Sequence, residues 1–202
     1  MPLQLFTFNL PTAPSKKEQT RRRAETPTLF AEDRFVDAPK LLIPMLSSSS
    51  REYIPIGFVD SKVVVSNLAS FIPNADNFLF GILNSKVLMA WLKTVGSRFK
   101  SDYRFSASIV YNTFPFFQPT DKQKRAIELT AQKILSVRAK FADSSLADLY
   151  DPLTMPKTLK DAHRANDAAV EAAYNFPKNF SESEIVAELM KLYSQTLQKS
   201  TV

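Results

Sequence analysis

The pattern of apolar residues changes near residue 118, and this change constrains the fold more than any other feature of the sequence. Residues 40–70 contain short runs rich in Ile, Val, Leu, Phe and Tyr, which favour strands. Helical spacing follows from Asn74 to about Gly96, and the aromatic segment 99–117 is expected to be extended. Beyond it only helical patterns occur. The sequence therefore predicts an α+β fold, with a mixed α/β region at about 1–118 that holds a β-rich platform, followed by a helical region at about 119–202.

Prolines and polar pairs predict where the strands turn or lie at a sheet edge. Asp60-Ser61 separates two β-rich runs and predicts a hairpin turn. Pro44 and Pro55 have no N–H for a sheet ladder, so their strands are expected at edges or bulges. Residues 1–39 show neither pattern and are expected to form an irregular arm. Its basic run KKEQTRRR is either solvated or in contact with phosphates.

Capping signals predict the ends of the helices. Asn84-Ser85 is expected to interrupt the first helical segment, with a new helix capped before Val87, and Gly96 is expected to end it. Thr120 and Gln123 form a capping box for a helix that reaches about Phe141. Two further helices are expected, at about 157–174 and from Ser181, where Glu184 completes a second box.

The composition limits the chemistry that the chain can perform. The sequence has no cysteine and one histidine, His163, which excludes thiolate metal sites and most histidine-based sites. We expect His163 to be a surface or helix-packing histidine rather than a general base. None of the three glycines begins a phosphate-binding loop, so we expect no metal, no cofactor and no independent enzymatic activity. No apolar run approaches the roughly 18 residues that span a bilayer, and the N-terminus lacks the basic start of a signal peptide, so a cytoplasmic location is expected.

Positive charge is concentrated in one stretch of the chain. The net charge is +6, and residues 86–125 carry eight basic and two acidic side chains, a surplus of six. Such a concentration favours approach to phosphates through counterion release, although a solvated face without a ligand remains open. The basic residues are Lys86, Lys93, Arg98, Lys100, Arg104, Lys122, Lys124 and Arg125.

The segment KSDYR places opposite charges at alternate positions. In an extended chain Lys100, Asp102 and Arg104 would share one face, while Tyr103 and Phe105 would point inward. A lysine can donate to the O6 and N7 atoms of guanine, and an aspartate can accept from the N4 amino group of the paired cytosine. Two interpretations follow, an exposed ladder of ion pairs or a row of groups that reads a G·C base pair.

Three blocks of sequence resemble a known family. They are REYIPIGFVDSKVVVSN, FLFGILNSKVLMAWLKTVGSRFKSDYRFSASIVYNTFPF and SLADLYDPLTMPKTLKDAHRANDAAVEAAY, in that order. Together, over about 26–174, the chain is similar to the MmeI-like single-chain type II restriction–modification enzymes, also called type IIL or IIG. The first two blocks resemble the target recognition domain of that family, and the third resembles its C-terminal helical domain.

The resemblance implies roles for particular residues. The family reads bases with the segment that matches KSDYR, where opposite charges at the Lys100 and Asp102 positions discriminate G·C from C·G. Arg104 matches a further recognition position, and Leu68 matches another more loosely. Arg98, Lys86 and Lys93 are expected to hold the DNA backbone.

The resemblance also implies the partners. We expect residues 1–118 to be a DNA target recognition domain, residues 119–202 a C-terminal helical domain, and the ligand to be double-stranded DNA read in the major groove. The catalytic motifs of the family are absent, so the chain is expected to be the specificity part of a prokaryotic DNA adenine methyltransferase and endonuclease. S-adenosylmethionine and Mg²⁺ are expected only in the domains that carry those motifs, on the same or a companion chain. The alternatives are a protein–protein docking module and a free-standing specificity subunit that acts in trans.

Overall fold

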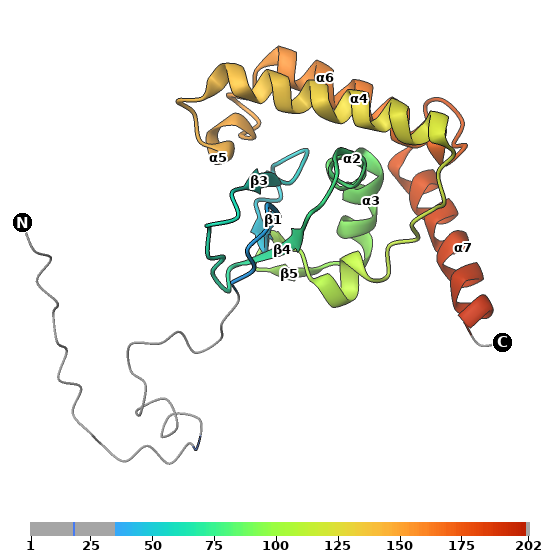
Figure 1. Cartoon of the computed structure of the whole chain (residues 1–202). Helices are drawn as coiled ribbons and strands as arrows, with labels where there is room; N and C mark the ends of the chain where they lie inside the picture. Colours follow the sequence, from blue (N-terminus) through green and yellow to red (C-terminus); the bar gives the residue numbers. More distant parts are fainter. Residues whose placement is uncertain (1–17, 19–34, 201–202) are drawn as a thin grey trace, which may run out of the picture. The chain divides into compact units, whose positions relative to one another are not determined.

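A computed structural model describes residue 18 and residues 35–200 of the chain, with side chains to residue 198. Residues 35–200 belong to one compact unit. The greater part of the expected irregular arm, with its basic run, lies outside the described residues. The chain combines two small antiparallel sheets with a helical C-terminal part, so the α+β prediction is confirmed (Figure 1).

The first sheet has the order β3-β1-β4. Its central strand β1 (Lys40–Pro44) pairs antiparallel with β3 (Gly57–Val59) and with β4 (Ala69–Pro73). The prediction of a hairpin at Asp60-Ser61 is wrong. A turn does form there, with the Lys62 N–H donating to Asp60 Oδ1 over 2.9 Å, but the strands on its two sides pair with β1 and not with each other.

Pro44 lies in a central strand, against the expectation of an edge. The sheet tolerates it because β3 pairs only with the first three residues of β1, Lys40–Leu42, so β1 has no neighbour on that side at Pro44. On the other side Pro44 lies opposite Ala69. A proline is accepted where no ladder donor is required of it.

The second sheet has the order β2-β6-β5. Strand β2 (Leu46–Ser47) pairs with β6 (Asp102–Arg104), and β6 pairs with β5 (Ser97–Phe99). The expected single extended segment 99–117 is therefore wrong. The chain reverses after Phe99, and after β6 it forms a π-helical turn, η1 (Ala107–Tyr111), around the buried Val110.

The helices form as their caps predict. Helix α2 (Asn77–Leu83) ends at Asn84, and Ser85 caps α3 (Lys86–Val95) by accepting from the Leu88 N–H. The capping box of Thr120 and Gln123 begins α4 (Asp121–Arg138), which continues in the 3₁₀ turn η2 (Ala139–Phe141). The remaining helices are α5 (Leu146–Leu149), α6 (Lys157–Ala173) and α7 (Glu182–Ser200).

The helices surround α2 and α3, which lie at the centre of the unit. Helices α4 and α6 run side by side across one side of the unit, and α7 packs on α3 (Figure 1). Trp91 of α3 is buried and meets Tyr193 of α7 with ring centroids 5.8 Å apart. No single helix in the described part of the chain could span a membrane. Helices α2 and α3 have the length and apolar composition of a membrane span only when they are taken together, and they are bent by 53° at the break between them. Most of their residues are buried in the core.

Candidate nucleic-acid interface

Gly96 directs the chain out of α3 and into the hairpin of β5 and β6. A Cβ atom at this position would lie 2.4 Å from the Leu92 carbonyl oxygen, closer than any side chain tolerates. Its φ of −67° is open to every residue, so the close approach alone requires glycine. The exit is thereby fixed, and β5 begins at the next residue.

The hairpin turn consists of Lys100 and Ser101, between the closing pair Phe99 and Asp102. Lys100 has a φ of +55°, in the left-handed region that costs an L-residue about 1–2 kcal/mol. Asp102 and Arg104 share one face of β6, as expected. Lys100 belongs to the turn and not to that strand face, so the expected continuous row of three charges is corrected to two on the strand and one at its tip.

The inner face of the hairpin is braced. Tyr103 and Phe105 are buried, which confirms that they point inward. The Arg98 guanidinium lies over the Tyr103 ring, 4.4 Å from its centroid, and donates to the Ser101 carbonyl over 3.0 Å. The side chain that was predicted to contact the DNA backbone thus also holds the turn. Its phosphate contact stays a prediction.

The outer face combines charge with exposed apolar groups. Leu46 lies opposite Arg104, and Phe99 lies opposite Asp102. Directly opposed residues of an antiparallel pair project to the same face, so these four side chains share it. Leu46 is 43% exposed and Phe99 57% exposed.

Leu68 lies beside this face although it is distant in sequence. The main chain of Met45 makes the connection, since its N–H donates to the Leu68 carbonyl over 3.0 Å and its carbonyl accepts from the Phe105 N–H over 2.8 Å. Leu68 is 72% exposed. All four sequence-predicted base-reading positions therefore lie on or beside one hairpin, with Lys100 at its turn, Asp102 and Arg104 on β6, and Leu68 beside the end of β6.

The three charged groups of the hairpin are not paired with one another. In the part of the chain that the structure describes, the side chains of Lys100, Asp102 and Arg104 form no ion pair and no hydrogen bond. Lys100 and Arg104 are exposed and Asp102 is half-buried. The hairpin is therefore not a ladder of ion pairs, and its charges are available to a ligand.

Lys86 and Lys93 have carboxylate partners on the later helices. Lys86 Nζ lies 3.3 Å from Glu171 of α6 and donates to the Phe180 carbonyl over 3.0 Å. Lys93 Nζ lies 2.6 Å from Glu182 of α7. Both lysines fasten α3 to the helical part, and the structure does not bring them to the hairpin. Their contact with the DNA backbone stays a prediction.

A buried polar network joins the β platform to the helical part. Arg138 of α4 donates through Nη1 to the Ile56 carbonyl over 2.6 Å, through Nη2 to Asn84 Oδ1 over 3.1 Å, and to the Tyr150 hydroxyl. Asn84 lies at the break between α2 and α3. One guanidinium thus ties three regions of the chain into a frame behind the hairpin, and its hydrogen bonds satisfy a charge that would otherwise be costly to bury.

His163 completes this network as a neutral side chain. Its Nδ1 lies 3.2 Å from the Asn84 carbonyl, which can only accept, so Nδ1 carries the proton and Nε2 accepts from the Tyr150 hydroxyl over 2.6 Å. Burial, with the positive charge of Arg138, lowers the pKa of His163 to about 3. The expectation of a packing histidine agrees with these contacts, since the ring is buried and stacks on Tyr53.

Asp167 anchors the β platform to the start of α3. Its carboxylate accepts from the Tyr53 hydroxyl over 2.6 Å and from the Lys86 backbone N–H over 2.7 Å. Burial raises the pKa of Asp167 to about 6, against the opposing effect of these two hydrogen bonds. Burial also raises the pKa of the Tyr53 hydroxyl, with the Asp167 charge acting in the same direction. Both groups serve the frame, and neither reaches the hairpin.

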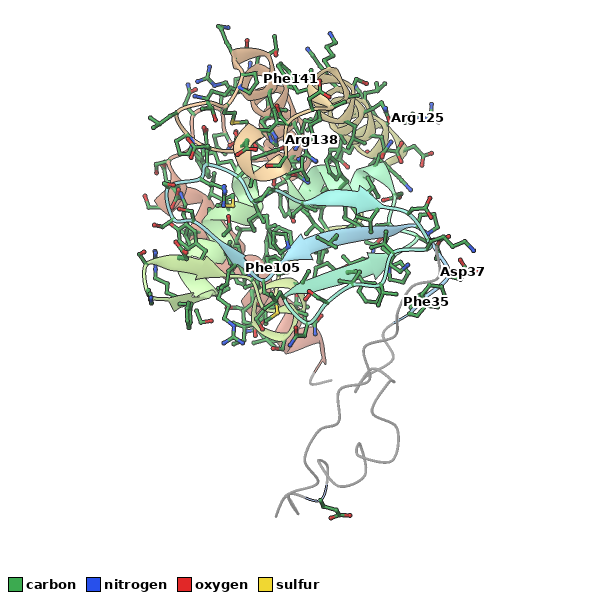
Figure 2. The ribbon with its side chains drawn as sticks, turned by 90° about the vertical axis from the view of Figure 1, so that its left-hand side faces the viewer. Phe35, Asp37, Phe105, Arg125, Arg138 and Phe141 are labelled. Atoms are coloured by element: carbon green, nitrogen blue, oxygen red, sulfur yellow. The ribbon has the colours of Figure 1, made fainter. Side chains whose placement is uncertain are left out.

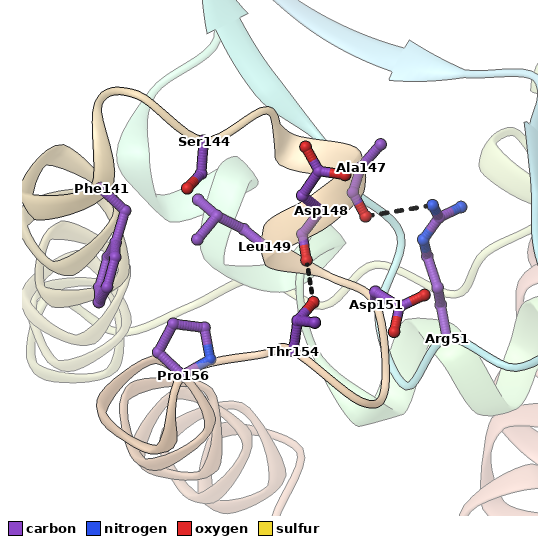
Figure 3. Close-up of a pocket in the computed structure, with 9 residues that line it drawn as sticks. All are labelled: Arg51, Phe141, Ser144, Ala147, Asp148, Leu149, Asp151, Thr154 and Pro156. Carbon is purple, nitrogen blue, oxygen red and sulfur yellow. Dashed lines mark hydrogen bonds between the residues drawn. The ribbon is translucent and has the colours of Figure 1, made fainter.

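A pocket of about 540 Å³ lies far from the hairpin, around α5 (Figure 3). Phe141 lines it, and a side view of the molecule places Phe141 near the top and Phe105 in the lower half (Figure 2). Its polar groups hold local turns, because Thr154 Oγ1 donates to the Asp148 carbonyl over 2.8 Å and Arg51 Nη2 to the Ala147 carbonyl over 3.3 Å. In the described part of the chain no group of three or more potential metal ligands occurs.

Comparisons with known proteins agree with this architecture. Residues 11–118 match the family model "MmeI, target recognition domain", and residues 119–200 match "MmeI, C-terminal domain". The chain is 37% identical over 185 residues to DNA methyltransferase A of Bacillus subtilis (strain 168), covering 92% of this chain and 21% of that protein. It is similar to a solved structure of the type IIL restriction–modification enzyme MmeI in complex with DNA, with a TM-score of 0.88 and 44% identity over 92% of this chain and 25% of that one.

These findings identify the class and then the family. The chain shares its fold with part of a type IIL restriction–modification enzyme. The chain belongs to the MmeI family, as its target recognition domain followed by its C-terminal domain. It spans about a quarter or less of the length of the relatives that it matches.

Sequence reasoning missed Phe99 and Leu46 as members of the outer face. In one continuous strand Phe99 would share the inward face of Tyr103 and Phe105. The turn at Lys100 and Ser101 reverses that parity and places Phe99 opposite Asp102. A two-residue gap between short strand-like runs was the available signal, but it contains none of the glycine or asparagine that usually marks such a turn.

Proposed function

We propose that this chain recognises a specific sequence in double-stranded DNA, with the hairpin of β5 and β6 inserted in the major groove. The observation that carries the proposal is the unpaired state of Lys100, Asp102 and Arg104 on a rigidly braced, exposed hairpin. A two-stranded ribbon fits the major groove of B-form DNA. The solved relative that the chain resembles was captured in complex with DNA, which supports the same ligand here.

Lys100 and Asp102 read one G·C pair in this proposal. The Lys100 ammonium donates to guanine O6 or N7, and the Asp102 carboxylate accepts from cytosine N4. A C·G pair would place the carboxylate against guanine acceptors and leave it unpaired, which disfavours binding. Arg104 reads a neighbouring base or phosphate, and Leu68 contributes a further contact from the adjoining segment.

The phosphate contacts are proposed to come from cations that have no carboxylate partner among the described residues. Within residues 86–125 Lys86, Lys93 and Lys124 have such partners. The others are Arg98, Lys100, Arg104, Lys122 and Arg125. Arg98 lies closest in sequence to the base-reading groups, so it is the first candidate to hold the backbone.

The role of the chain is proposed to be specificity and not catalysis. Its three glycines begin no phosphate-binding loop, which supports the proposal that S-adenosylmethionine and Mg²⁺ bind elsewhere. We place those cofactors in a methyltransferase and nuclease partner of the same or a companion chain, in the bacterial cytoplasm. We retain residues 1–118 as the recognition domain and residues 119–202 as the helical domain that docks the partner.

A charge reversal tests the proposed function. A duplex enriched from a random library by the full chain is compared with the same duplex in which one G·C pair is inverted. Lys100→Glu with Asp102→Arg is expected to invert the preference at one base pair by about 1–3 kcal/mol. The affinity of the unaltered chain is expected to fall steeply with salt.

The matched control reverses a pair on α7, Glu188→Lys with Lys191→Glu, whose side chains now lie 2.6 Å apart. This control leaves the net charge unchanged and should keep the original preference. An unchanged preference in the hairpin variant would contradict the base-reading roles. Failure of the chain to bind any duplex at low salt would instead support a protein-docking module.

A further inference from the structure

Phe99 carries an exposed aromatic ring, and the pairing of β5 with β6 holds it on the outer face of the hairpin. It is the last residue of β5 and closes the turn opposite Asp102. The inner face beneath the hairpin is already filled by Tyr103, on which Arg98 lies. Phe99 therefore stays on the outer face, 57% exposed, with its backbone fixed by strand pairing.

The outer face combines polar and apolar chemistry at a short separation. Directly opposed residues of an antiparallel pair hold their Cβ atoms about 4.5–5.5 Å apart. Phe99 and Asp102 are such a pair. A ligand that donates a hydrogen bond to the Asp102 carboxylate must therefore offer an apolar atom beside its donor, or it leaves the Phe99 ring in water.

Cytosine has this arrangement on its major-groove edge. The N4 amino group is the donor. The ring carbon C5, which adjoins the carbon that carries this amino group, is apolar and faces the same groove. In thymine the C5 atom carries a methyl group, but an acceptor oxygen replaces the amino group. Asp102 therefore rejects thymine. Adenine also offers an amino donor, N6, but the neighbouring atom on its major-groove edge is the N7 acceptor, so the base that satisfies both side chains is a cytosine.

We propose that Phe99 covers C5 of the same cytosine whose N4 amino group donates to Asp102. This contact makes the chain sensitive to a methyl group at C5. This inference rests on the proposed function. The ring is partly open to solvent, so an added methyl group finds room against it and loses contact with water on that side. The chain therefore binds a 5-methylcytosine at this position more tightly than an unmodified cytosine.

The test uses the full chain and a duplex enriched from a random library. The relevant cytosine is located as the one at which Asp102→Asn relaxes the base preference. Binding is then measured for this duplex with cytosine or 5-methylcytosine at that position. We expect the methyl group to tighten binding about three- to fivefold, as for one additional buried methyl group.

Phe99 variants separate its role from a general effect of methylation. Phe99→Ala should bind the two duplexes equally, and Phe99→Leu should keep part of the difference. Leu129→Ala removes another exposed apolar side chain, 73% exposed on α4, and should keep the full difference. Thermal unfolding of each variant confirms that the hairpin change leaves the fold intact.

The outcomes distinguish this inference from the proposed function. Equal or weaker binding of the methylated duplex by the unaltered chain overturns the role of Phe99, and so does a methyl preference that survives Phe99→Ala. In both cases sequence-specific binding persists and the proposed function stands. If the library yields no enriched duplex, the proposed function fails and the role of Phe99 fails with it.

Discussion

Two buried titratable groups on α6 make the pH dependence of stability a direct test of the frame behind the hairpin. His163 and Asp167 lie one helical turn apart. The pKa of His163 is lowered to about 3 from 6.5, and the pKa of Asp167 is raised to about 6 from 3.8, in both cases chiefly by burial. The two shifts have opposite effects on the free energy of unfolding.

The sign follows from which state binds the proton. Between pH 3 and 6.5 the unfolded chain carries a proton on His163 that the folded chain does not, so this group makes stability rise with pH. Between pH 3.8 and 6 the folded chain carries a proton on Asp167 that the unfolded chain does not, so this group makes stability fall with pH. Each slope is at most about 1.4 kcal/mol per pH unit. Between pH 4 and 6 the two contributions therefore cancel.

Asp167→Asn removes one side of this balance. The amide can still accept from the Lys86 N–H through its oxygen and donate to the Tyr53 hydroxyl through its nitrogen, so the contacts are preserved. Relative to the unaltered chain, the stability of the variant should increase from pH 4 to pH 6 by about 2–3 kcal/mol. Relative to the unaltered chain, the variant is thus least stable at acid pH and most stable near neutral pH, where the unaltered chain carries a buried carboxylate.

Urea denaturation at pH 4, 5 and 6 measures this difference. The single tryptophan, Trp91, is buried and reports unfolding by its fluorescence. Asp161→Asn, an exposed carboxyl on the same helix, is the matched control and should run nearly parallel to the unaltered chain over this range. If the difference between Asp167→Asn and the unaltered chain does not change with pH, the carboxyl does not titrate near 6 and the reasoning is refuted.

Two further substitutions separate folding from recognition. Lys100→Gly removes a left-handed lysine that costs about 1–2 kcal/mol and adds a glycine entropy cost of about 0.5–1 kcal/mol. The free energy of unfolding, measured in urea, should therefore stay equal or rise. The preference at the G·C pair should be lost. A loss of more than about 1 kcal/mol would show that Lys100 is held by packing instead. Gly81→Ala places a Cβ 2.6 Å from Ile127 Cγ2 and 3.0 Å from Asn166 Oδ1, so overpacking should cost about 1–2 kcal/mol after the gain in helix propensity, with the base preference unchanged. Equal or higher stability would mean that α4 shifts freely.

The helices could be predicted from sequence because their signals are local. The boxes of Thr120 with Gln123 and of Ser181 with Glu184 lie within one turn of the helices that they begin. Ser85 likewise marks the start of α3. Each of these caps satisfies backbone groups of its own segment, so no knowledge of the rest of the fold is required.

The arrangement of the strands could not be predicted in the same way. Pairing of β1 with both β3 and β4 depends on segments that are not consecutive, and the sequence favoured a hairpin between the wrong two. The turn at Lys100 uses a left-handed lysine in place of glycine, so it carries no typical turn signal.

The candidate site shows the same division between local and distant information. Lys100, Asp102 and Arg104 are close in sequence, and one hairpin carries all three. Lys86 and Lys93 were chosen for their charge alone, but their carboxylate partners are on α6 and α7, more than eighty residues later. A count of charges cannot show which cations the fold neutralises.

The main chain of Met45 joins the segment of Leu68 to the end of β6 without help from any side chain. Backbone hydrogen bonds form regardless of which residue supplies the amide. The outward-pointing groups at 46, 68, 99, 102 and 104 can therefore be exchanged without disturbing the scaffold that presents them. Under the proposed function, exposed substitutions at these positions would change the target sequence while the scaffold stays the same.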